Sequence, residues 1–534
     1  MVNWSPKRLD CCSPRKRKMS AMESLVVLLS SSLCLFLLQI LVKFLYRVWW
    51  TPIRVQHLMR SQGIVGPSYR FLYGTNDQLL KMRTEALSRP MTDLSHNIYP
   101  RIQPHLYLWI NKYGTNFLQW FGPQPQLVMS EPDLIKEVLT NKDRIYRKPP
   151  VQGYSKKILG NGLFTSQGEK WSKMRKLANY AFHGESLKNM IPEMVASVEM
   201  MLESWDKYHG KEIEVFEEFR RLTSEVISRT AFGSSYLEGQ NIFDMISKLA
   251  VITQRNSFKF RIPGIGKILR YGDEFEAEEL EKGIHNSILK LFKKREERVM
   301  SGESDSYGND FFGLLINTYH DDDESKKISV EDLVDECKTF YFGGQETTNT
   351  LLSWTVLLLA IHTDWQEEAR NEILKILGQQ TPNAEGIAKL KIMSMIINET
   401  LRLYPPVLSL HRQVSKEIRL GKLTLPANMY LLLSILALHH DPNIWGEDVH
   451  LFKPERFSEG VAKAADGNSA AYLPFGAGPR ICVGFNFATI EAKIALCMIL
   501  QRYSFRLSPA YVHSPFQLLT VRPQYGVQVI LNAL

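Results

Sequence analysis

The chain has 534 residues, of which 44% are hydrophobic and 23% charged, and its formal net charge is +9. This composition is typical of a globular protein with a large core and excludes a disordered chain. Residues 1–18 hold six basic residues and one acid, so the rest of the chain carries only +4, which excludes the basic surface of a nucleic-acid-binding protein. None of the six cysteines belongs to a Cys-x-x-Cys pair, which argues against a disulfide framework or a zinc site and favours a reducing compartment.

An apolar segment near the N-terminus predicts a membrane anchor. Residues 25–42 carry no charge, and with the residues that follow they approach the ~20 apolar residues that span a bilayer. Basic and aromatic residues come next, without a small-residue cleavage site, so we expect an uncleaved transmembrane helix over 22–45 rather than a secretory signal. Prolines and glycines in residues 46–75 predict a linker, and a folded domain is expected over 76–534.

The orientation of this helix depends on where translation begins. The basic residues of 1–21 would hold the N-terminus in the cytosol and place the folded body on the far, oxidising side of the membrane. Translation from Met22 would leave the positive flank after the helix and place the body in the cytosol. We therefore expect residues 1–21 to be an alternative or artefactual extension, and mass spectrometry of the native N-terminus tests this.

The first part of the body is predicted to combine a small hairpin with helices. Residues 117–121 and 126–129 flank a Gly-Pro pair, which predicts the hairpin. In the next helical stretch, Trp171 and Arg175 are four residues apart and therefore lie on one face. Residues 191–300 predict amphipathic helices. Breaks in this region are expected at Gly233, Gly239 and 263–264.

A long helix is predicted over 329–362, because Ser329 and the acid three residues later form a capping-box pattern. Glycine inside a helix costs about 1 kcal/mol relative to alanine. Two adjacent glycines nevertheless stand at 343–344, followed by Glu346 and Thr347. This pattern predicts a local opening of the helix beside a small ligand. The alternative is a core helix that tolerates two glycines.

Three further residues form an acid–arginine pattern. Glu399 and Arg402 are three residues apart and share a helical face, and Arg456 follows later in a Pro-Glu-Arg-Phe sequence. An acid and an arginine at this spacing most often form a solvated ion pair. His439 and His440 have no third ligand at metal spacing, so they are predicted to lie in a loop rather than to bind a metal.

A glycine-rich stretch near the C-terminus holds a single cysteine, Cys482, behind Arg480 and before an apolar helical run over 485–500. Glycines allow backbone N–H groups to approach a sulfur closely, and the positive end of the following helix would lower the thiol pKa. Arg480 can reach a haem propionate as a charge-assisted pair. The pattern therefore predicts a thiolate bound to haem iron, a ligation that favours O–O cleavage. The alternative is a glycine-rich loop with a buried structural cysteine.

The same stretch fits the signature Phe-x-x-Gly-x-Arg-x-Cys-x-Gly at Phe475, Gly478, Arg480, Cys482 and Gly484 and resembles the cytochromes P450. The resemblance covers nearly the whole chain, because the other motifs stand in the order and spacing of that family. It implies the cytochrome P450 fold, which is mainly α with small β-sheets. The overall sequence is most similar to plant microsomal members of the clan that acts on terpenoid- and steroid-like hormones and related metabolites.

The resemblance also implies roles for individual residues. Besides Cys482 as the axial ligand of the iron, the side chains implied to contact the haem are Trp171, Arg175, Arg412, Phe475 and Arg480. Thr347 would hydrogen-bond the bound dioxygen or its ordered water, and Glu346 would help to relay protons. A buried triad that fixes the cysteine loop would consist of Glu399, Arg402 and Arg456. Val407 and Leu410 would face the substrate.

The function implied by the resemblance is that of a haem-thiolate monooxygenase that hydroxylates a lipophilic, terpenoid- or steroid-like molecule. Its cofactor would be haem b. The sequence has no dinucleotide-binding fingerprint, so electrons from NADPH would arrive through NADPH–cytochrome P450 reductase. The expected location is the endoplasmic reticulum membrane, with a cytosolic catalytic domain. Two alternatives stay open: an isomerase or dehydratase with this fold, against which the acid–threonine pair counts, and a non-catalytic haem protein.

Overall fold

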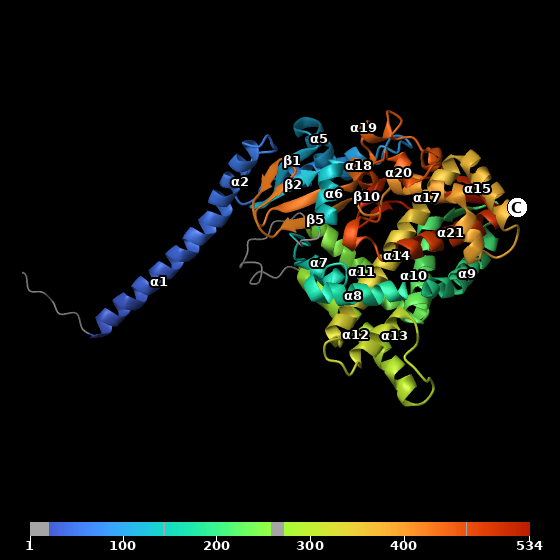
Figure 1. Ribbon diagram of the computed structural model, residues 1–534, viewed down its shortest axis with the longest axis horizontal. Coiled ribbons are helices and arrows are strands. Elements are labelled where there is room, and N and C mark those ends of the chain that lie inside the picture. Colours follow the sequence, from blue (N-terminus) through green and yellow to red (C-terminus); the bar gives the residue numbers. More distant parts are fainter. Residues whose placement is uncertain (1–20, 142–144, 258–271, 466) are drawn as a thin grey trace, which may run out of the picture.

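A computed structural model of the chain describes residues 21–141, 145–257, 272–465 and 467–534. Figure 1 shows a mainly helical body, with small sheets where α2 meets it and with α1 projecting away as a single rod. The predicted architecture, mainly α with small β-sheets, is confirmed. The expectation about residues 1–21 concerns residues that lie, apart from Ala21, outside the described part of the chain.

The α-helices of the described residues are α1 Ala21–Leu45, α2 Thr51–Arg60, α3 Asn76–Leu87, α4 Tyr99–Ile102, α5 Pro104–Tyr113, α6 Pro132–Thr140, α7 Tyr154–Leu159, α8 Gly168–Ala181, α9 Glu185–Trp205, α10 Val215–Phe232, α11 Tyr236–Asn256, α12 Gly272–Met300, α13 Phe311–Tyr319, α14 Val330–Ile361, α15 Thr363–Ile376, α16 Ala384–Lys389, α17 Lys391–Leu403, α18 Ile435–His439, α19 Pro442–Trp445, α20 Val461–Ala464 and α21 Phe485–Arg502. The strands are β1 Asn116–Phe121, β2 Gln124–Met129, β3 Tyr146–Arg147, β4 Glu212–Glu214, β5 Ser409–Val414, β6 Ile418–Leu420, β7 Leu423–Leu425, β8 Tyr430–Ser434, β9 Tyr503–Leu507, β10 Pro515–Gln517, β11 Val521–Pro523 and β12 Gln528–Ala533.

The largest sheet has the order β1-β2-β8-β5-β3, and the predicted hairpin forms its first two strands. β2 and β8 run parallel, with Gln126 opposite Tyr430, while β5 and β8 are antiparallel. A second sheet has the order β4-β12-β9, and β6–β7 and β10–β11 are two-stranded. β5 therefore lies between β8 and β3 in the largest sheet, and pairing on both edges fixes the directions of its alternating side chains.

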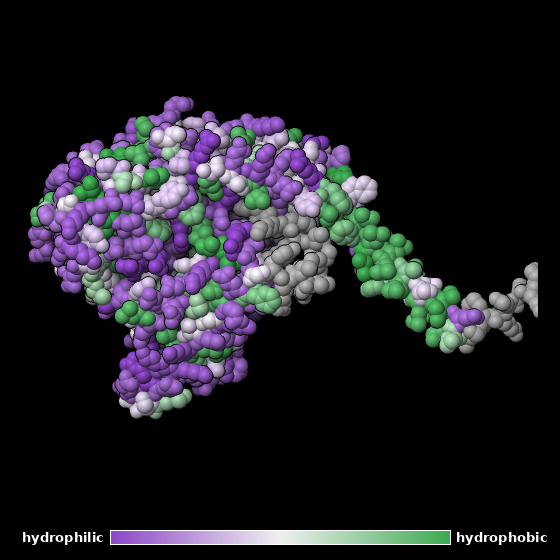
Figure 2. All heavy atoms as spheres, turned by 180° about the vertical axis from the view of Figure 1, so that it is seen from behind, coloured by the Kyte–Doolittle hydropathy of each residue, from purple (hydrophilic) through white to green (hydrophobic). Residues whose placement is uncertain are grey.

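The N-terminal helix is longer than the predicted anchor. α1 continues through a π-helical turn, Tyr46–Trp50, into α2. Residues Met22–Arg60 are the one stretch of the described chain that is long and apolar enough to cross a membrane. Figure 2 shows its apolar surface extending from the polar body. Val55 and Met59 are buried against the body, so the first part of the predicted linker is a docked helix rather than a loop.

α14 is the central helix of the body. Its start is predicted correctly, because Ser329 and Asp332 form both hydrogen bonds of a capping box. Every residue over 351–360 is buried, as expected of a helix surrounded by others. Around it, α10 ends at Gly233 in the left-handed conformation, as the sequence predicts.

Two other expected breaks have different outcomes. Gly239 lies inside α11, so the prediction of a break there is wrong. An added Cβ at Gly239 would lie 3.4 Å from Cε2 of Phe243 and 3.5 Å from Cε1 of Tyr341 on α14. Residues 263–264 lie outside the described part of the chain.

Candidate functional site

The loop that carries Cys482 is a tight turn between Phe475 and α21. The Cys482 N–H donates to the Phe475 carbonyl over 2.9 Å, and the Phe475 ring packs against Phe485 with ring centroids 4.7 Å apart. Gly478 has φ +70°, and an added Cβ would lie 2.2 Å from the Leu139 carbonyl oxygen. Only glycine fits there, because both the backbone conformation and the space exclude a side chain.

The Cys482 thiol has one predicted neighbour, the N–H of a loop glycine, and one that was not predicted, the Arg175 guanidinium. The Gly484 N–H and the Arg175 guanidinium both act to lower the thiol pKa. The surrounding protein keeps water from the thiol and outweighs both groups, so the thiol pKa is raised, although part of the residue surface is exposed. An added Cβ at Gly484 would lie 4.0 Å from the sulfur, an ordinary contact, so space does not require glycine at this position. The lowering of the thiol pKa predicted from the start of α21 is therefore outweighed in the protein without haem; coordination to a metal ion would remove the proton.

Trp171 and Arg175, both on α8, reach the cysteine loop from one side. The Arg480 guanidinium lies over the Trp171 ring, with its central carbon 4.5 Å from the ring centroid. Arg480 also donates to the Ser166 carbonyl over 2.8 Å, and Arg175 donates to the Ile481 carbonyl. The structure therefore brings both α8 residues into contact with the residues that flank Cys482.

A cluster of cations lies beside this loop. Burial lowers the pKa of Arg412 to about 10, and burial together with the charges of Arg412 and Arg175 lowers the pKa of Arg480 to about 10. Lys148 belongs to the same cluster, since burial and then the charges of Arg412 and Arg480 lower its pKa to about 7. Sequence reasoning missed Lys148, which belongs to no recognisable motif.

None of these four cations forms an ion pair with a carboxylate among the described residues. Arg412 donates to the His411 carbonyl over 2.9 Å, and the Lys148 ammonium lies over the Phe164 ring at 4.0 Å. Arg412 is buried and the other three are partly buried, and charges withdrawn from water without counterions are costly, so the cluster is suited to an anionic group. The two propionates of haem are such groups, and the donor set beside Cys482 fits a haem.

The glycine pair of α14 has two separate roles. The helix is continuous from Val330 to Ile361, so the predicted local opening is wrong. An added Cβ at Gly344 would lie 2.6 Å from Cγ1 of Ile227, whereas at Gly343 it would meet no atom of the described residues within 4 Å apart from its own helix and chain neighbours. Gly344 therefore permits close packing of α14 against α10, and Gly343 faces open space. The Thr347 hydroxyl donates to the Gly343 carbonyl over 2.7 Å and is partly exposed on the same stretch.

Glu346 does not share the surroundings of Thr347. Its buried carboxylate forms an ion pair with Arg522 of β11, with Nε 2.6 Å from Oε1, and it accepts a hydrogen bond from the Thr520 hydroxyl. Successive residues of a helix point about 100° apart, so the acid faces the C-terminal hairpin. Arg522 is a second functional candidate that sequence reasoning missed.

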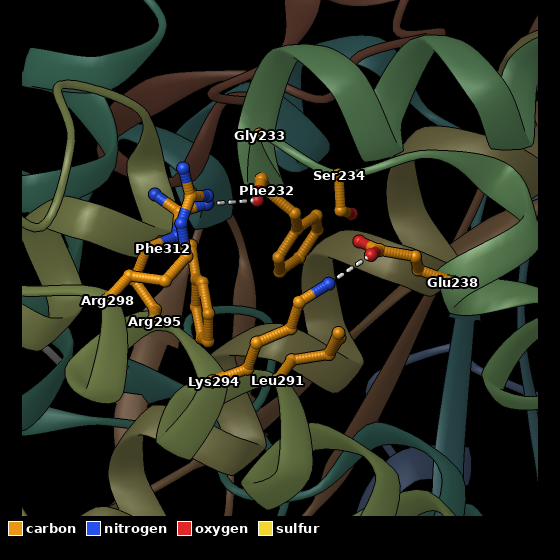
Figure 3. A pocket seen from close by; sticks show the side chains of 9 residues that line it. All are labelled: Phe232, Gly233, Ser234, Glu238, Leu291, Lys294, Arg295, Arg298 and Phe312. Carbon is orange, nitrogen blue, oxygen red and sulfur yellow. Dashed lines mark hydrogen bonds and ion pairs between the residues drawn. The ribbon is translucent and has the colours of Figure 1, made fainter. Parts of the chain in front are cut away.

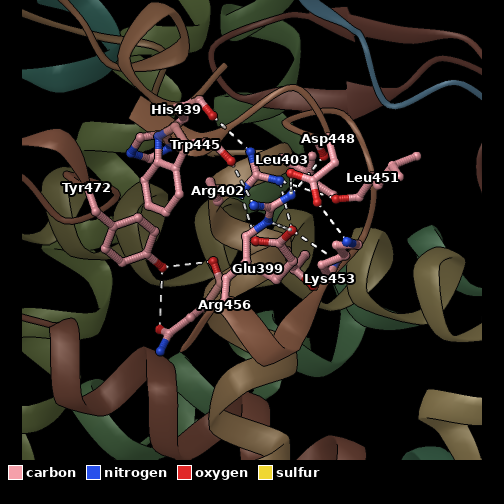
Figure 4. A network of polar contacts seen from close by, with 12 residues as sticks. Glu399, Arg402, Leu403, His439, Trp445, Asp448, Leu451, Lys453, Arg456 and Tyr472 are labelled. Atoms are coloured by element: carbon pink, nitrogen blue, oxygen red, sulfur yellow. Dashed lines mark hydrogen bonds and ion pairs between the residues drawn. The ribbon is translucent and has the colours of Figure 1, made fainter. Parts of the chain in front are cut away.

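Glu399, Arg402 and Arg456 lie together. Arg402 donates two hydrogen bonds of 2.7 Å to Glu399, and both side chains are fully buried. The Arg456 Nε lies 3.5 Å from Glu399 Oε1, and Arg456 also pairs with Asp448. Figure 4 shows the carboxylate of Glu399 between the two guanidinium groups.

Among the remaining predicted residues, Leu410 lies next to the loop and His439 lies in α18. Val407 and Leu410 are partly buried, and Leu410 Cδ1 would be 3.6 Å from a Cβ added to Gly476 of the cysteine loop. On β5, Leu410 and Arg412 are two residues apart and share a face of the sheet. His439 ends the helix α18 instead of lying in the predicted loop. The described residues contain no group of three side chains able to hold a metal ion.

A separate hollow lies between α10, α11 and α12 and contains none of the predicted site residues (Figure 3). Arg295 donates there to the carbonyls of Phe232 and Tyr307 and pairs with Asp310. Lys294 pairs with Glu238. These charges are already satisfied, so the hollow adds no candidate chemistry.

Comparison with known proteins identifies the family. Residues 101–531 match the Cytochrome P450 family. Cytochrome P450 CYP749A22 of Panax ginseng is 60% identical over 507 residues, which are 95% of this chain and 97% of that protein. Cytochrome P450 CYP72A219 of Panax ginseng is 41% identical over 96% of this chain and 99% of its own length, and Cytochrome P450 716A67 of Medicago truncatula is 41% identical over 91% and 94%. The chain therefore belongs to the cytochrome P450 family and resembles its plant members, which are haem-containing monooxygenases.

Proposed function

We propose that this enzyme hydroxylates a lipophilic, terpenoid- or steroid-like small molecule with electrons that come from NADPH through NADPH–cytochrome P450 reductase. The observation that carries the proposal is the set of buried and partly buried cations, without carboxylate partners among the described residues, around an exposed cysteine, because it fits one haem and leaves an apolar side for a substrate. Leu410 supplies apolar surface beside the cysteine loop, and Val407 packs partly buried against the same hydrophobic cluster. The absence of a dinucleotide fingerprint from the sequence agrees with electron supply by a second protein.

In this proposal Cys482 binds the iron of haem b, and haem held by a thiolate supplies the oxidising chemistry. The propionates pair with Arg412 and Arg480, to which we add Lys148. Arg175 and Trp171 hold the loop and Arg480 in place. Phe475 packs beneath the loop, and its carbonyl fixes the backbone of Cys482.

Proton supply is assigned to the acid–threonine pair. The Thr347 hydroxyl lies next to the open space at Gly343, where it can hold a water molecule and pass a proton. Glu346 is the acid that renews this proton. Because Arg522 and Thr520 hold its carboxylate, this relay requires the ion pair to open.

We also propose a structural role for the triad and a location for the enzyme. Glu399, Arg402 and Arg456 hold the segment that leads to the cysteine loop. The apolar helix anchors the enzyme in the endoplasmic reticulum membrane through residues 22–45, with the catalytic domain, residues 76–534, in the cytosol. The length and apolar composition of this helix support the anchor.

Difference spectra of the purified, haem-loaded protein against a panel of terpenoids and sterols test the substrate class. A hit is then incubated with NADPH and a microsomal reductase, and the product should contain one added oxygen atom. Turnover without NADPH would favour an isomerase or dehydratase. Rapid reduction without any oxidised product across the panel would favour a non-catalytic haem protein.

A further inference from the structure

His439 is a buried link between the acid–arginine pair and the cysteine loop. It is fully buried at the end of α18, and its Nε2 accepts a hydrogen bond from the Leu473 N–H over 3.0 Å. An imidazole that accepts at Nε2 carries its proton on Nδ1. Burial and the charge of Arg402 lower the pKa of His439 to about 3, so the ring stays a neutral acceptor at physiological pH.

The other side of His439 is tied to α17. Its carbonyl accepts a hydrogen bond of 2.9 Å from Arg402, the same guanidinium that pairs with Glu399 (Figure 4). The Tyr472 ring stacks on the imidazole, with centroids 5.3 Å apart and planes 21° apart. The Tyr472 hydroxyl donates to the Asn398 carbonyl over 2.9 Å. The imidazole and its backbone are thus held from two directions by one helix.

The hydrogen bonds continue from Leu473 into the cysteine loop. The Gly476 N–H donates to the Leu473 carbonyl over 3.0 Å, and the Cys482 N–H donates to the Phe475 carbonyl over 2.9 Å. Leu473 itself is buried, so without His439 its N–H would have no partner among the described residues. A polar group left buried and unpaired favours a rearranged loop.

We propose that His439 is a positioning residue that transmits the rigid geometry of the Glu399–Arg402 pair to the cysteine loop and so keeps the Cys482 sulfur in place for bonding haem iron. This inference rests on the proposed haem-thiolate function. The adjacent His440 provides a natural control. It is also buried, but its Nε2 contacts the Leu403 carbonyl of α17 over 3.0 Å rather than the cysteine loop.

The test compares variants of the full-length, haem-loaded protein. His439→Phe keeps a ring but removes the acceptor, whereas the Oε1 of His439→Gln can take the place of Nε2. His440→Phe is the matched control. Two rates are measured in mild denaturant: the loss of the ferrous–CO absorption typical of thiolate ligation, and global unfolding followed by far-UV circular dichroism.

We expect His439→Phe to lose the thiolate absorption about tenfold faster than His440→Phe at similar rates of unfolding, since an unpaired buried N–H favours the open loop by about that factor. His439→Gln should restore most of the stability of the absorption. Equal rates for the two phenylalanine variants, or no recovery by glutamine, would overturn the inference.

A second pair of variants covers the case in which His439→Phe does not fold. His439→Asn carries the same amide on a side chain too short to reach Leu473, so it should lose the absorption faster than His439→Gln; equal rates would again overturn the inference. The unmodified protein separates the two hypotheses. If it never shows the thiolate absorption, the proposed function fails, and if it shows the absorption but His439 variants do not change its lifetime, only the role of His439 fails.

Discussion

The adjacent glycines of α14 lead to opposite predictions for the same substitution. Alanine at either position gains about 1 kcal/mol in the free energy of unfolding, because glycine is a poor residue for a helix interior. At Gly343 the new Cβ meets no atom of the described residues within 4 Å apart from its own helix and chain neighbours, so the gain remains. At Gly344 it would lie 2.6 Å from Cγ1, 2.7 Å from Cδ1 and 3.1 Å from Cβ of Ile227. Rotation of the Ile227 side chain cannot move its Cβ, so α10 and α14 have to separate.

Overpacking of this kind costs about 1–3 kcal/mol. Gly343→Ala should therefore raise the free energy of unfolding by about 1 kcal/mol, whereas Gly344→Ala should lower it by about 0–2 kcal/mol. The gain in helix propensity is common to both variants. The difference between them is thus the packing cost alone.

Urea unfolding followed by far-UV circular dichroism, at equal haem content, measures this difference. Ile227→Val removes Cδ1 and should recover part of the loss in the Gly344→Ala background, and a double-mutant cycle isolates that coupling. Equal stability of the two alanine variants, or a more stable Gly344→Ala, would refute the packing argument.

Four further outcomes are expected. Cys482→Ser should keep the fold but lose the ferrous–CO absorption of thiolate ligation; persistence of that band would exclude Cys482 as the ligand. Thr347→Ala should bind haem but release more peroxide per NADPH consumed, and unchanged coupling would count against the relay. Glu399→Gln removes the negative charge that balances the buried Arg402 guanidinium, so urea unfolding should show a loss of about 3–5 kcal/mol, against at most about 0.5 kcal/mol for the exposed control Glu455→Gln. Burial and the charge of Arg83 lower the pKa of His105 from 6.5 to about 3, so the unfolded chain binds one more proton between these values. The stability of the fold should therefore fall by up to about 1.4 kcal/mol per pH unit from this group as pH drops through that range, and His105→Gln should remove that part of the slope in urea midpoints measured against pH.

Local sequence patterns predicted those features whose defining residues stand only a few positions apart in the chain. The capping box at Ser329 predicted where α14 begins, because both of its hydrogen bonds join residues three apart. The stretch around Cys482 predicted the family, since the ligand, the arginine and the turn glycine stand in one short run. Trp171 and Arg175 were placed correctly on one face of α8 by helical spacing alone.

Tertiary structure alone decided which groups face one another. Glu346 and Arg522 are 176 residues apart, and they pair because β11 lies beside α14. Lys148 joins the cation cluster, and His439 meets Leu473 just before the cysteine loop, through packing that no local spacing encodes. The thiol pKa of Cys482 depends on how much protein surrounds the sulfur, and that burial outweighs the N–H group and the arginine beside it. Capping hydrogen bonds and helical periodicity relate residues that are only a few positions apart, so they can be predicted from sequence. Burial and contacts between distant residues arise only when the whole chain has packed.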